Sequence, residues 1–351
     1  GNLIGTALNS AEALLDQEGI VVTGQSVKDV EIGHRENLER RNLISGNEPN
    51  GIVLSEKAEG VTIRGNFIGT SPSDNEDIGN VDYGIYLSNI TSAEIGTTEE
   101  PHAPNIISGN KQAGIFITQN TGGDDLRIAH NYIGTNKDGT AAVPNKFGIK
   151  VMFPNGQQDR TLRIGGSHDL LAQEQTGGLG EGNLISGNSE AGIGIEGGEG
   201  SADVVFNVQI HGNLIGTNRD GDAAVPNEVY GVYILGRGIL DTFVGDENDP
   251  ALGNVISGNG EVGITVASDA TEVEIYNNYI GSAANPDIRV PNEIDGILLS
   301  SGAHENIIKN NTIWYNGESG ITVVNSDTEE NTFKENSIHL NKEIGRASCR
   351  E

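Results

Sequence analysis

A short motif that recurs along residues 2–341 is the feature that most constrains the fold of this chain. The motif is an Asn, an apolar residue and an Ile, followed by Ser-Gly-Asn, Gly-Thr or Gly-Ser. It begins at Asn2, Asn42, Asn66, Asn105, Asn131, Asn183, Asn213, Asn254 and Asn278, with degenerate copies at Asn311 and Asn336. Such a period indicates a repeat architecture in which each unit packs against its neighbours.

A second motif, Gly-Ile-x-apolar, lies between successive copies of the first. It begins at Gly51, Gly84 and Gly114, for example, and a third short apolar stretch such as residues 61–63 follows it. Alternating apolar stretches bounded by Gly, Asn, Ser and Asp read as β-strands separated by turns. Each repeat unit is therefore predicted to contain three strands.

The shortest units, such as the one from Asn42 to Asn66, leave no room for a helix between strands. Neighbouring parallel strands need a crossover, and here the crossover is the rest of one turn of a coil. Turns stacked about 4.8 Å apart would pair every strand with its counterparts above and below. The sequence predicts an all-β fold, a right-handed parallel β-helix with three parallel sheets and about ten turns.

The predicted inward positions are branched aliphatic residues. Ile52, Ile85 and Ile115 should stack in one column, which explains how a chain with 5% aromatic residues builds a core. Gly and Asn suit the corners because they tolerate a left-handed backbone. Stacked Asn side chains should also hydrogen-bond along the ladder, as amide ladders do in cross-β stacks.

The ends of the chain depart from this regularity. It starts at Gly1 inside a motif and without Met, so we expect a fragment truncated at both ends. Residues 344–351 break the pattern and resemble a translated sequencing-library adapter, which leaves residues 1–343 as a single β-helix domain. The only Cys, Cys349, lies in that tail, so no disulfide is expected. The insertion from Ser167 to Gly177 predicts a short helix.

Charge and hydropathy exclude two classes of partner. The chain has 50 Asp and Glu against 21 Lys and Arg, a formal net charge of −29. Phosphates of nucleic acid would be repelled by this excess. No stretch approaches the ~18 consecutive apolar residues of a membrane-spanning helix, so membrane insertion is not expected.

The strings NLISGN, NLIGTN, DGTAAVPN and GIxI resemble the right-handed parallel β-helix repeat family, the pectate-lyase-like superfamily of secreted bacterial proteins. The resemblance covers residues 1–341 and is strongest with repeats of large surface proteins. It implies an extracellular or cell-surface location and flanking domains in the parent chain. Enzymes of this superfamily cleave or epimerise acidic polysaccharides, but the motif specifies the fold more than the activity.

Long loops are expected to flank the sheet made by the Asn-apolar-Ile strands. The outward residues of that sheet are apolar or aromatic and include Phe67, Tyr132 and Tyr279. They could form the floor of a groove that contacts a glycan. They could instead pack beneath the loops as a satellite core, which is the favoured interpretation.

A second outward column is expected on the Gly-Ile sheet, where it includes Tyr86 and Phe116. Their ring faces could stack on sugars, because aromatic rings combine an apolar face with a defined geometry. Lateral stacking between neighbouring turns is a sufficient alternative explanation. Tyr86 and Phe116 therefore join the candidate glycan-contact residues.

Acidic loops offer the candidate metal site. Asp246, Glu247 and Asp249 lie close together in one loop, and carboxylate oxygens suit the flexible coordination of Ca²⁺. The spacing matches no tight ligand series, and acidic loops are usually solvated. Calcium is the one cofactor that the sequence suggests.

These observations lead to three interpretations of function. The leading one is a non-catalytic extracellular β-helix module of a larger secreted or surface protein, which contacts polysaccharide along a loop-walled face. Its loops are copied from turn to turn, whereas a catalytic site needs a turn that departs from the rest in its polar groups. The alternative is a polysaccharide lyase, hydrolase or uronate epimerase. A spacer without a ligand is a third possibility.

Overall fold

The computed structural model describes most of the chain. The described ranges are 1–6, 13, 17–34, 41–73, 78–97, 104–118, 125–152, 161–166, 180–198, 205–237 and 240–342. The helix expected at residues 167–177 and the tail at 344–351 lie outside them.

The described strands form three parallel sheets. The first sheet contains the Asn-apolar-Ile strands β1 (Leu3–Ile4), β4 (Leu43–Ile44), β7 (Phe67–Ile68), β10 (Ile106–Ile107), β13 (Tyr132–Ile133), β16 (Leu184–Ile185), β19 (Leu214–Ile215), β22 (Val255–Ile256), β25 (Tyr279–Ile280), β28 (Thr312–Trp314) and β31 (Ser337–His339). The second contains the Gly-Ile strands β2 (Ile20–Thr23), β5 (Ile52–Ser55), β8 (Tyr83–Ser88), β11 (Ala113–Thr118), β14 (Phe147–Met152), β17 (Ala191–Glu196), β20 (Tyr230–Leu235), β23 (Val262–Ala267), β26 (Ile297–Leu299) and β29 (Ile321–Val323).

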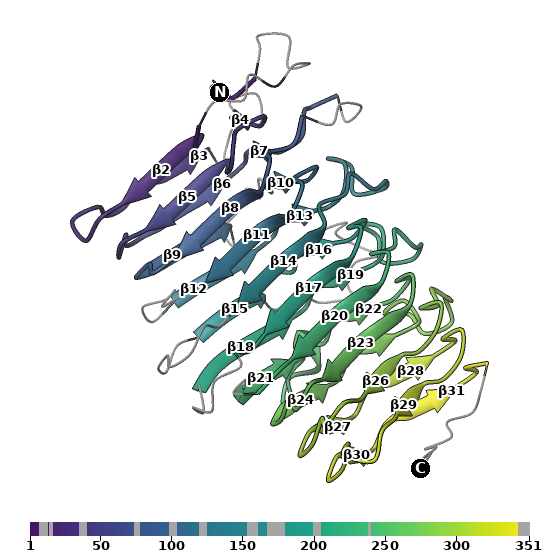
Figure 1. Ribbon diagram of the computed structural model, residues 1–351. Coiled ribbons are helices and arrows are strands. Elements are labelled where there is room, and N and C mark those ends of the chain that lie inside the picture. Colours follow the sequence, from purple (N-terminus) through teal and green to yellow (C-terminus); the bar gives the residue numbers. More distant parts are fainter. Residues whose placement is uncertain are drawn as a thin grey trace.

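The third sheet contains the remaining strand of each turn. These strands are β3 (Glu31–Gly33), β6 (Val61–Arg64), β9 (Ser92–Gly96), β12 (Asp125–Ala129), β15 (Thr161–Gly165), β18 (Val205–His211), β21 (Leu240–Val244), β24 (Val273–Tyr276), β27 (Ile307–Lys309) and β30 (Thr332–Lys334). In each sheet the neighbours in space are three apart in strand number, so the chain coils once for every three strands. Figure 1 shows these turns stacked from the purple N-terminal end to the yellow C-terminal end.

The register confirms the predicted columns and the β-helix fold. Ile52 pairs with Ile85, and Ile85 pairs with Ile115, in the second sheet. All three side chains are fully buried. They belong to one continuous aliphatic core that runs through the coil from Val22 to Ile313. Burial of branched side chains in stacked rows supplies the main driving force of this fold.

Asparagine side chains form the predicted ladder at the start of the first sheet. Asn42 Nδ2 donates to Asn66 Oδ1 at 2.9 Å, and Asn66 Nδ2 donates to Asn105 Oδ1 at 3.0 Å. Each buried rung also satisfies main-chain groups, as Asn105 Nδ2 does for the Ile63 carbonyl at 2.8 Å. The ladder pairs polar corner groups that the coil removes from water.

A second ladder follows the end of the same sheet, and it joins two different motifs. Asn110 of Ser-Gly-Asn donates through Nδ2 to Asn145 Oδ1 at 2.9 Å, although Asn145 ends the loop sequence Val-Pro-Asn. Asn145 in turn donates to Asn188 at 3.1 Å. The Asn that ends a long loop and the Asn of Ser-Gly-Asn in a short turn therefore occupy the same corner of the coil.

The long loops that follow β13 and β19 are tight hairpins with nearly identical internal bonds. Thr135 bridges to Ala142, and Thr217 bridges to Ala224. Asn136 Oδ1 accepts from the backbone N–H of Thr140 at 2.9 Å, as expected of an Asx-type turn. These loops lean over the outward face of the first sheet.

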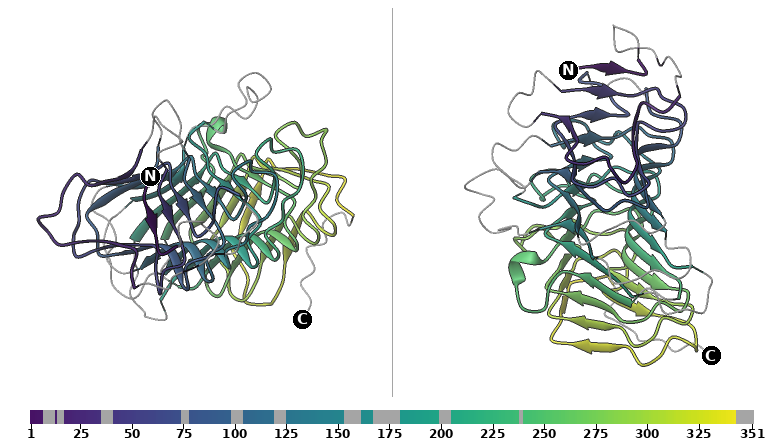
Figure 2. Two further views of the ribbon diagram at one scale, coloured as in Figure 1. Left: turned by 90° about the horizontal axis from the view of Figure 1, so that it is seen from above. Right: turned by 90° about the vertical axis from the view of Figure 1, so that its left-hand side faces the viewer.

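Helix is scarce in the described residues. The short 3₁₀ helix η2 (Pro250–Leu252) projects from the side of the coil (Figure 2) and is capped by Asp249. No helix in the described ranges has the length and hydropathy needed to cross a membrane.

Candidate functional site

The first outward column lies under the long loops. Phe67 is 7% exposed and Tyr132 is 8% exposed. The Arg41 guanidinium lies 5.0 Å from the centre of the Phe67 ring. Gly139 of the long loop lies so close to Tyr132 that an added Cβ would come within 3.3 Å of its ring. Burial also raises the pKa of the Tyr132 hydroxyl.

Phe67 and Tyr132 are therefore covered, which agrees with the favoured interpretation of a satellite core and not with an open groove floor. Phe67 and Tyr132 both flank Ile106 in register and belong to one satellite cluster of buried apolar residues. Tyr279 remains partly exposed at the edge of the same cluster.

The second sheet carries a better candidate on its outward side. We call it the aromatic face and define it by Tyr83, Tyr86, Phe116, Phe147, Tyr230 and Tyr233. Its rings come from β8, β11, β14 and β20. Tyr83, Tyr86 and Tyr230 are partly exposed, whereas Phe116, Phe147 and Tyr233 are buried at 9%, 5% and 3% exposure.

Small residues on alternate turns make room for these rings. Ala113 separates Tyr83 from Phe147, and Ala191 separates Phe147 from Tyr230, in one register column. In the neighbouring column the Tyr233 ring covers Gly194, where an added Cβ would meet the ring at 2.5 Å. Alternation of large and small residues lets the rings lie across the strands.

The rings are in direct contact with one another. Tyr83 stacks on Phe116 with centroids 4.4 Å apart and planes inclined by 21°. Tyr86 lies 5.9 Å from Tyr83 with an inclination of 19°. At the other end, Tyr230 meets Tyr233 edge to face at 5.8 Å. Offset and edge-to-face pairs are the favoured aromatic geometries, so the face is pre-organised.

A polar centre interrupts the aromatic face. Glu196 Oε1 accepts a hydrogen bond from the Tyr233 hydroxyl at 2.7 Å and lies 3.1 Å from Lys150 Nζ. Lys150 Nζ also lies 4.3 Å from the centre of the Phe147 ring. Burial, followed by the bond to Glu196, raises the pKa of Tyr233, so its hydroxyl stays a hydrogen-bond donor.

Of the sequence candidates, Tyr86 has a partly exposed ring in this face, and Phe116 is buried and stacks on Tyr83. Sequence reasoning missed Tyr83, Tyr230 and Glu196. A usable signal was the residue before each Gly-Ile motif, which is aromatic at Tyr83 and Tyr230 and small at Ala113 between them.

The candidate calcium residues have other partners. Asp246 Oδ1 accepts from the backbone N–H groups of Asn248 and Asp249, at 2.8 and 2.9 Å. Asp249 caps η2 through the N–H of Ala251. Glu247 Oε1 lies 3.0 Å from Lys309 Nζ, and this bond raises the pKa of Lys309.

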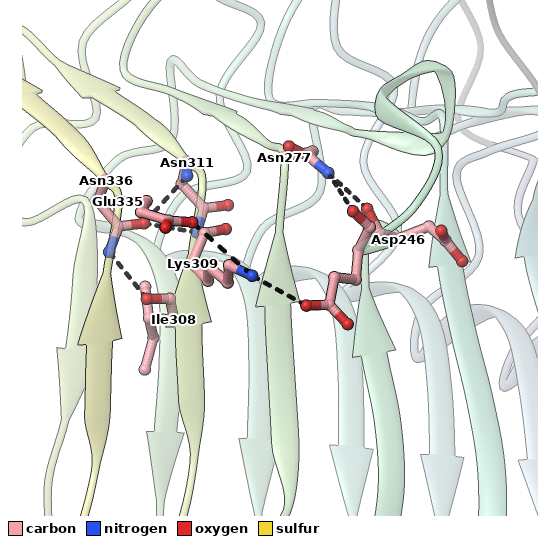
Figure 3. Close-up of polar contacts among 8 residues, drawn as sticks. Asp246, Asn277, Ile308, Lys309, Asn311, Glu335 and Asn336 are labelled. Carbon is pink, nitrogen blue, oxygen red and sulfur yellow. Dashed lines mark hydrogen bonds and ion pairs between the residues drawn. The ribbon is translucent and has the colours of Figure 1, made fainter.

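Figure 3 shows Lys309 between this carboxylate and Glu335, with Asn277 reaching the Asp246 main chain. Within the described ranges, no three His, Cys, Asp or Glu side chains are grouped so that they could hold a metal ion. The contacts of Asp246, Glu247 and Asp249 are those of a folded loop and a surface ion pair.

The third sheet has an open cavity of about 330 Å³ on its outward side. Thr62, Ser92, Glu94 and Arg127 supply its polar lining. Arg127 pairs in register with Glu94, and its guanidinium lies 2.7 Å from Glu181. The cavity therefore places a cation beside carboxylates.

The comparisons with known proteins bear on the fold. The family described as right-handed beta helix region matches residues 227–348. Comparisons with curated proteins and with solved structures found no significant match. The family match and the three stacked parallel sheets agree that the chain is a right-handed parallel β-helix repeat protein.

Proposed function

We propose that this chain is a non-catalytic β-helix module that contacts polysaccharide through the aromatic face. The observation that carries the proposal is the set of partly exposed rings, Tyr83, Tyr86 and Tyr230, held over stacked neighbours. A sugar ring has an apolar C–H face that can lie on an aromatic ring, and the phenol hydroxyl can bond to sugar hydroxyls. Tyrosines fixed by packing bind at low entropic cost.

The polar centre supports the same function. Ligand sites combine apolar lining with a few convergent polar groups that fix orientation. Lys150, Glu196 and the Tyr233 hydroxyl supply such groups at the middle of the aromatic face. Glu196 already pairs with a lysine and a tyrosine, which suits a positioning role better than proton transfer.

We also propose an extracellular or cell-surface location, in a larger parent protein. The support is the resemblance of the NLISGN and DGTAAVPN strings to repeats of secreted surface proteins. The acidic surface, with its formal net charge of −29, suits a module that must stay soluble outside the cell.

A polysaccharide-active enzyme is the second candidate, and the third-sheet cavity favours it. Arg127 lies there beside Glu94 and Glu181, so a guanidinium that can bind an anionic sugar group stands next to carboxylates that can transfer protons. Product formation from polysaccharide, abolished by Arg127→Gln, is the result expected of this candidate.

Affinity electrophoresis in gels that contain soluble polysaccharides tests the proposed function. The wild-type chain should migrate more slowly in at least one gel, and the double variant Tyr83→Ala/Tyr230→Ala should lose most of that retardation. Tyr279→Ala is the matched control, because it removes a partly exposed ring from the first sheet. Equal retardation of the double variant and the wild type would overturn the proposal.

A further inference from the structure

The charges on the aromatic face are paired with one another. Lys150 Nζ lies 3.1 Å from Glu196, and Lys146 Nζ lies 3.3 Å from Glu190. Both lysines also lie over the Phe147 ring, at 4.3 and 5.3 Å from its centre. These two cations are therefore held by carboxylates and by an aromatic ring.

The surroundings of the face are acidic. Asp82 lies next to Tyr83 and contributes, after burial, to the raised pKa of that tyrosine. The whole chain carries 50 acidic against 21 basic side chains. A polyanion that approached the face would meet this negative field and would have to displace Glu190 or Glu196 to reach a lysine.

We infer that the ligand of the aromatic face is a neutral glycan chain, and not a polymer of uronic acids. The inference rests on the proposed function and adds the class of polysaccharide. Stacking and hydroxyl contacts are the interactions that the face offers. Neither depends on a charge in the ligand.

The length of the face fits an extended chain of sugars. Tyr83 stands on β8 and Tyr230 on β20, which are four steps apart in the second sheet, along β8, β11, β14, β17 and β20. At about 4.8 Å per step, these strands span about 19 Å. Ring contacts therefore lie at both ends of the face, and the Lys150–Glu196 pair lies between them.

Isothermal titration with two kinds of soluble polymer tests the inference. The probes are hydroxyethyl cellulose, which is neutral, and polygalacturonate, which is anionic. Each is measured at about 0.01 M and about 1 M salt, where the Debye length falls from about 30 Å to about 3 Å. We expect binding of the neutral polymer with affinity that changes by less than about twofold with salt, and no polygalacturonate binding.

Glu196→Gln sharpens the test, because it leaves Lys150 unpaired while the amide oxygen can still accept from Tyr233. The ratio of polygalacturonate to neutral-glycan affinity should rise at least about threefold at low salt. Glu190→Gln, which frees Lys146 at a more exposed ion pair, is the second variant should the first fail to fold.

The outcomes separate the two proposals. Salt-sensitive binding of polygalacturonate by the wild type, or binding of a cationic glucosamine polymer alone, would overturn the inference and leave the proposed function standing. Absence of binding to every polysaccharide tested would overturn the proposed function itself. Neutral binding that is lost in Tyr83→Ala/Tyr230→Ala supports both.

Discussion

The guanidinium carbon of Arg289 lies 4.6 Å from the centre of the Tyr315 ring. Other turns have two small residues at this position. Ala142, in the long loop that follows β13, packs on Gly187, where an added Cβ would come within 2.9 Å of the alanine. Arg289 forms a β-bridge with Ser282, just as Ala142 does with Thr135. The Arg289–Tyr315 contact is therefore the equivalent of the Ala142–Gly187 contact. At this position, an arginine and a tyrosine take the place of an alanine and a glycine.

Replacing Arg289 by alanine and Tyr315 by glycine should reveal an interaction free energy between these two side chains. Arg289→Ala and Tyr315→Gly each remove the cation–π contact, while glycine relieves the positive φ of 66° at residue 315. The double variant should be more stable than the sum of the single effects predicts, by about 0.5–1 kcal/mol. Urea unfolding of the four proteins measures this difference. Additive effects would show that the two side chains do not interact.

The asparagine ladder should contribute more at its middle than at its end. Asn183 Oδ1 accepts from the backbone N–H of Asn131 at 3.0 Å, and its Nδ2 donates to the Ile128 carbonyl at 2.8 Å. Asn183→Ala leaves these buried groups unsatisfied and should cost at least about 2 kcal/mol of unfolding free energy. Asn2→Ala, at the exposed end, should cost under about 1 kcal/mol, because water replaces the amide. Equal losses in chemical denaturation would contradict the account.

His211 should make the protein sensitive to mild acid. Burial lowers its pKa below the ordinary value of about 6.5, and its buried Nε2 atom has no hydrogen-bond partner among the described residues. The unfolded chain then binds a proton at higher pH than the folded chain does. Stability should be unaffected above the unfolded pKa and should fall as pH drops below about 6.5, towards the folded pKa. His211→Gln should flatten this part of a thermal unfolding profile recorded between about pH 7 and pH 5. If the variant lost stability with falling pH as steeply as the wild type, His211 would not be the cause of the acid sensitivity.

Gly194 should be intolerant of a side chain because the Tyr233 ring lies on it. Gly194→Ala places a Cβ within 2.5 Å of the ring, which must move away from Glu196. We expect a loss of about 1–3 kcal/mol in unfolding free energy. In a Tyr233→Ala background the same substitution should cost little. A similar loss in both backgrounds would show that the backbone, and not the ring, restricts residue 194.

Much of the fold could be predicted because the repeat itself sets the register. Once Gly51, Gly84 and Gly114 begin equivalent strands, Ile52, Ile85 and Ile115 must share a column, as they do. The Asn42 ladder follows for the same reason. Sequence period fixes which residues are stacked, and stacking fixes the core.

The candidate site could be predicted only in part, because it depends on contacts between different elements. Whether Tyr132 faces solvent is decided by Gly139 of a loop that the period does not place. Tyr86 was found through its column, but the Lys150–Glu196 pair depends on side chains reaching from β14 to β17. The local sequence pattern carries little information on which side chains of different strands and loops come into contact.

The contact between glycan and tyrosine is tested most directly by nuclear magnetic resonance of the chain with ¹³C-labelled tyrosine rings. The chain has eight tyrosines, so each ring signal can be assigned by single Phe substitutions. Addition of hydroxyethyl cellulose should shift the signals of Tyr83, Tyr86 and Tyr230 and leave those of Tyr132 and Tyr279 in place. Shifts confined to Tyr279, or no shift of any ring at saturating polymer, would contradict the account.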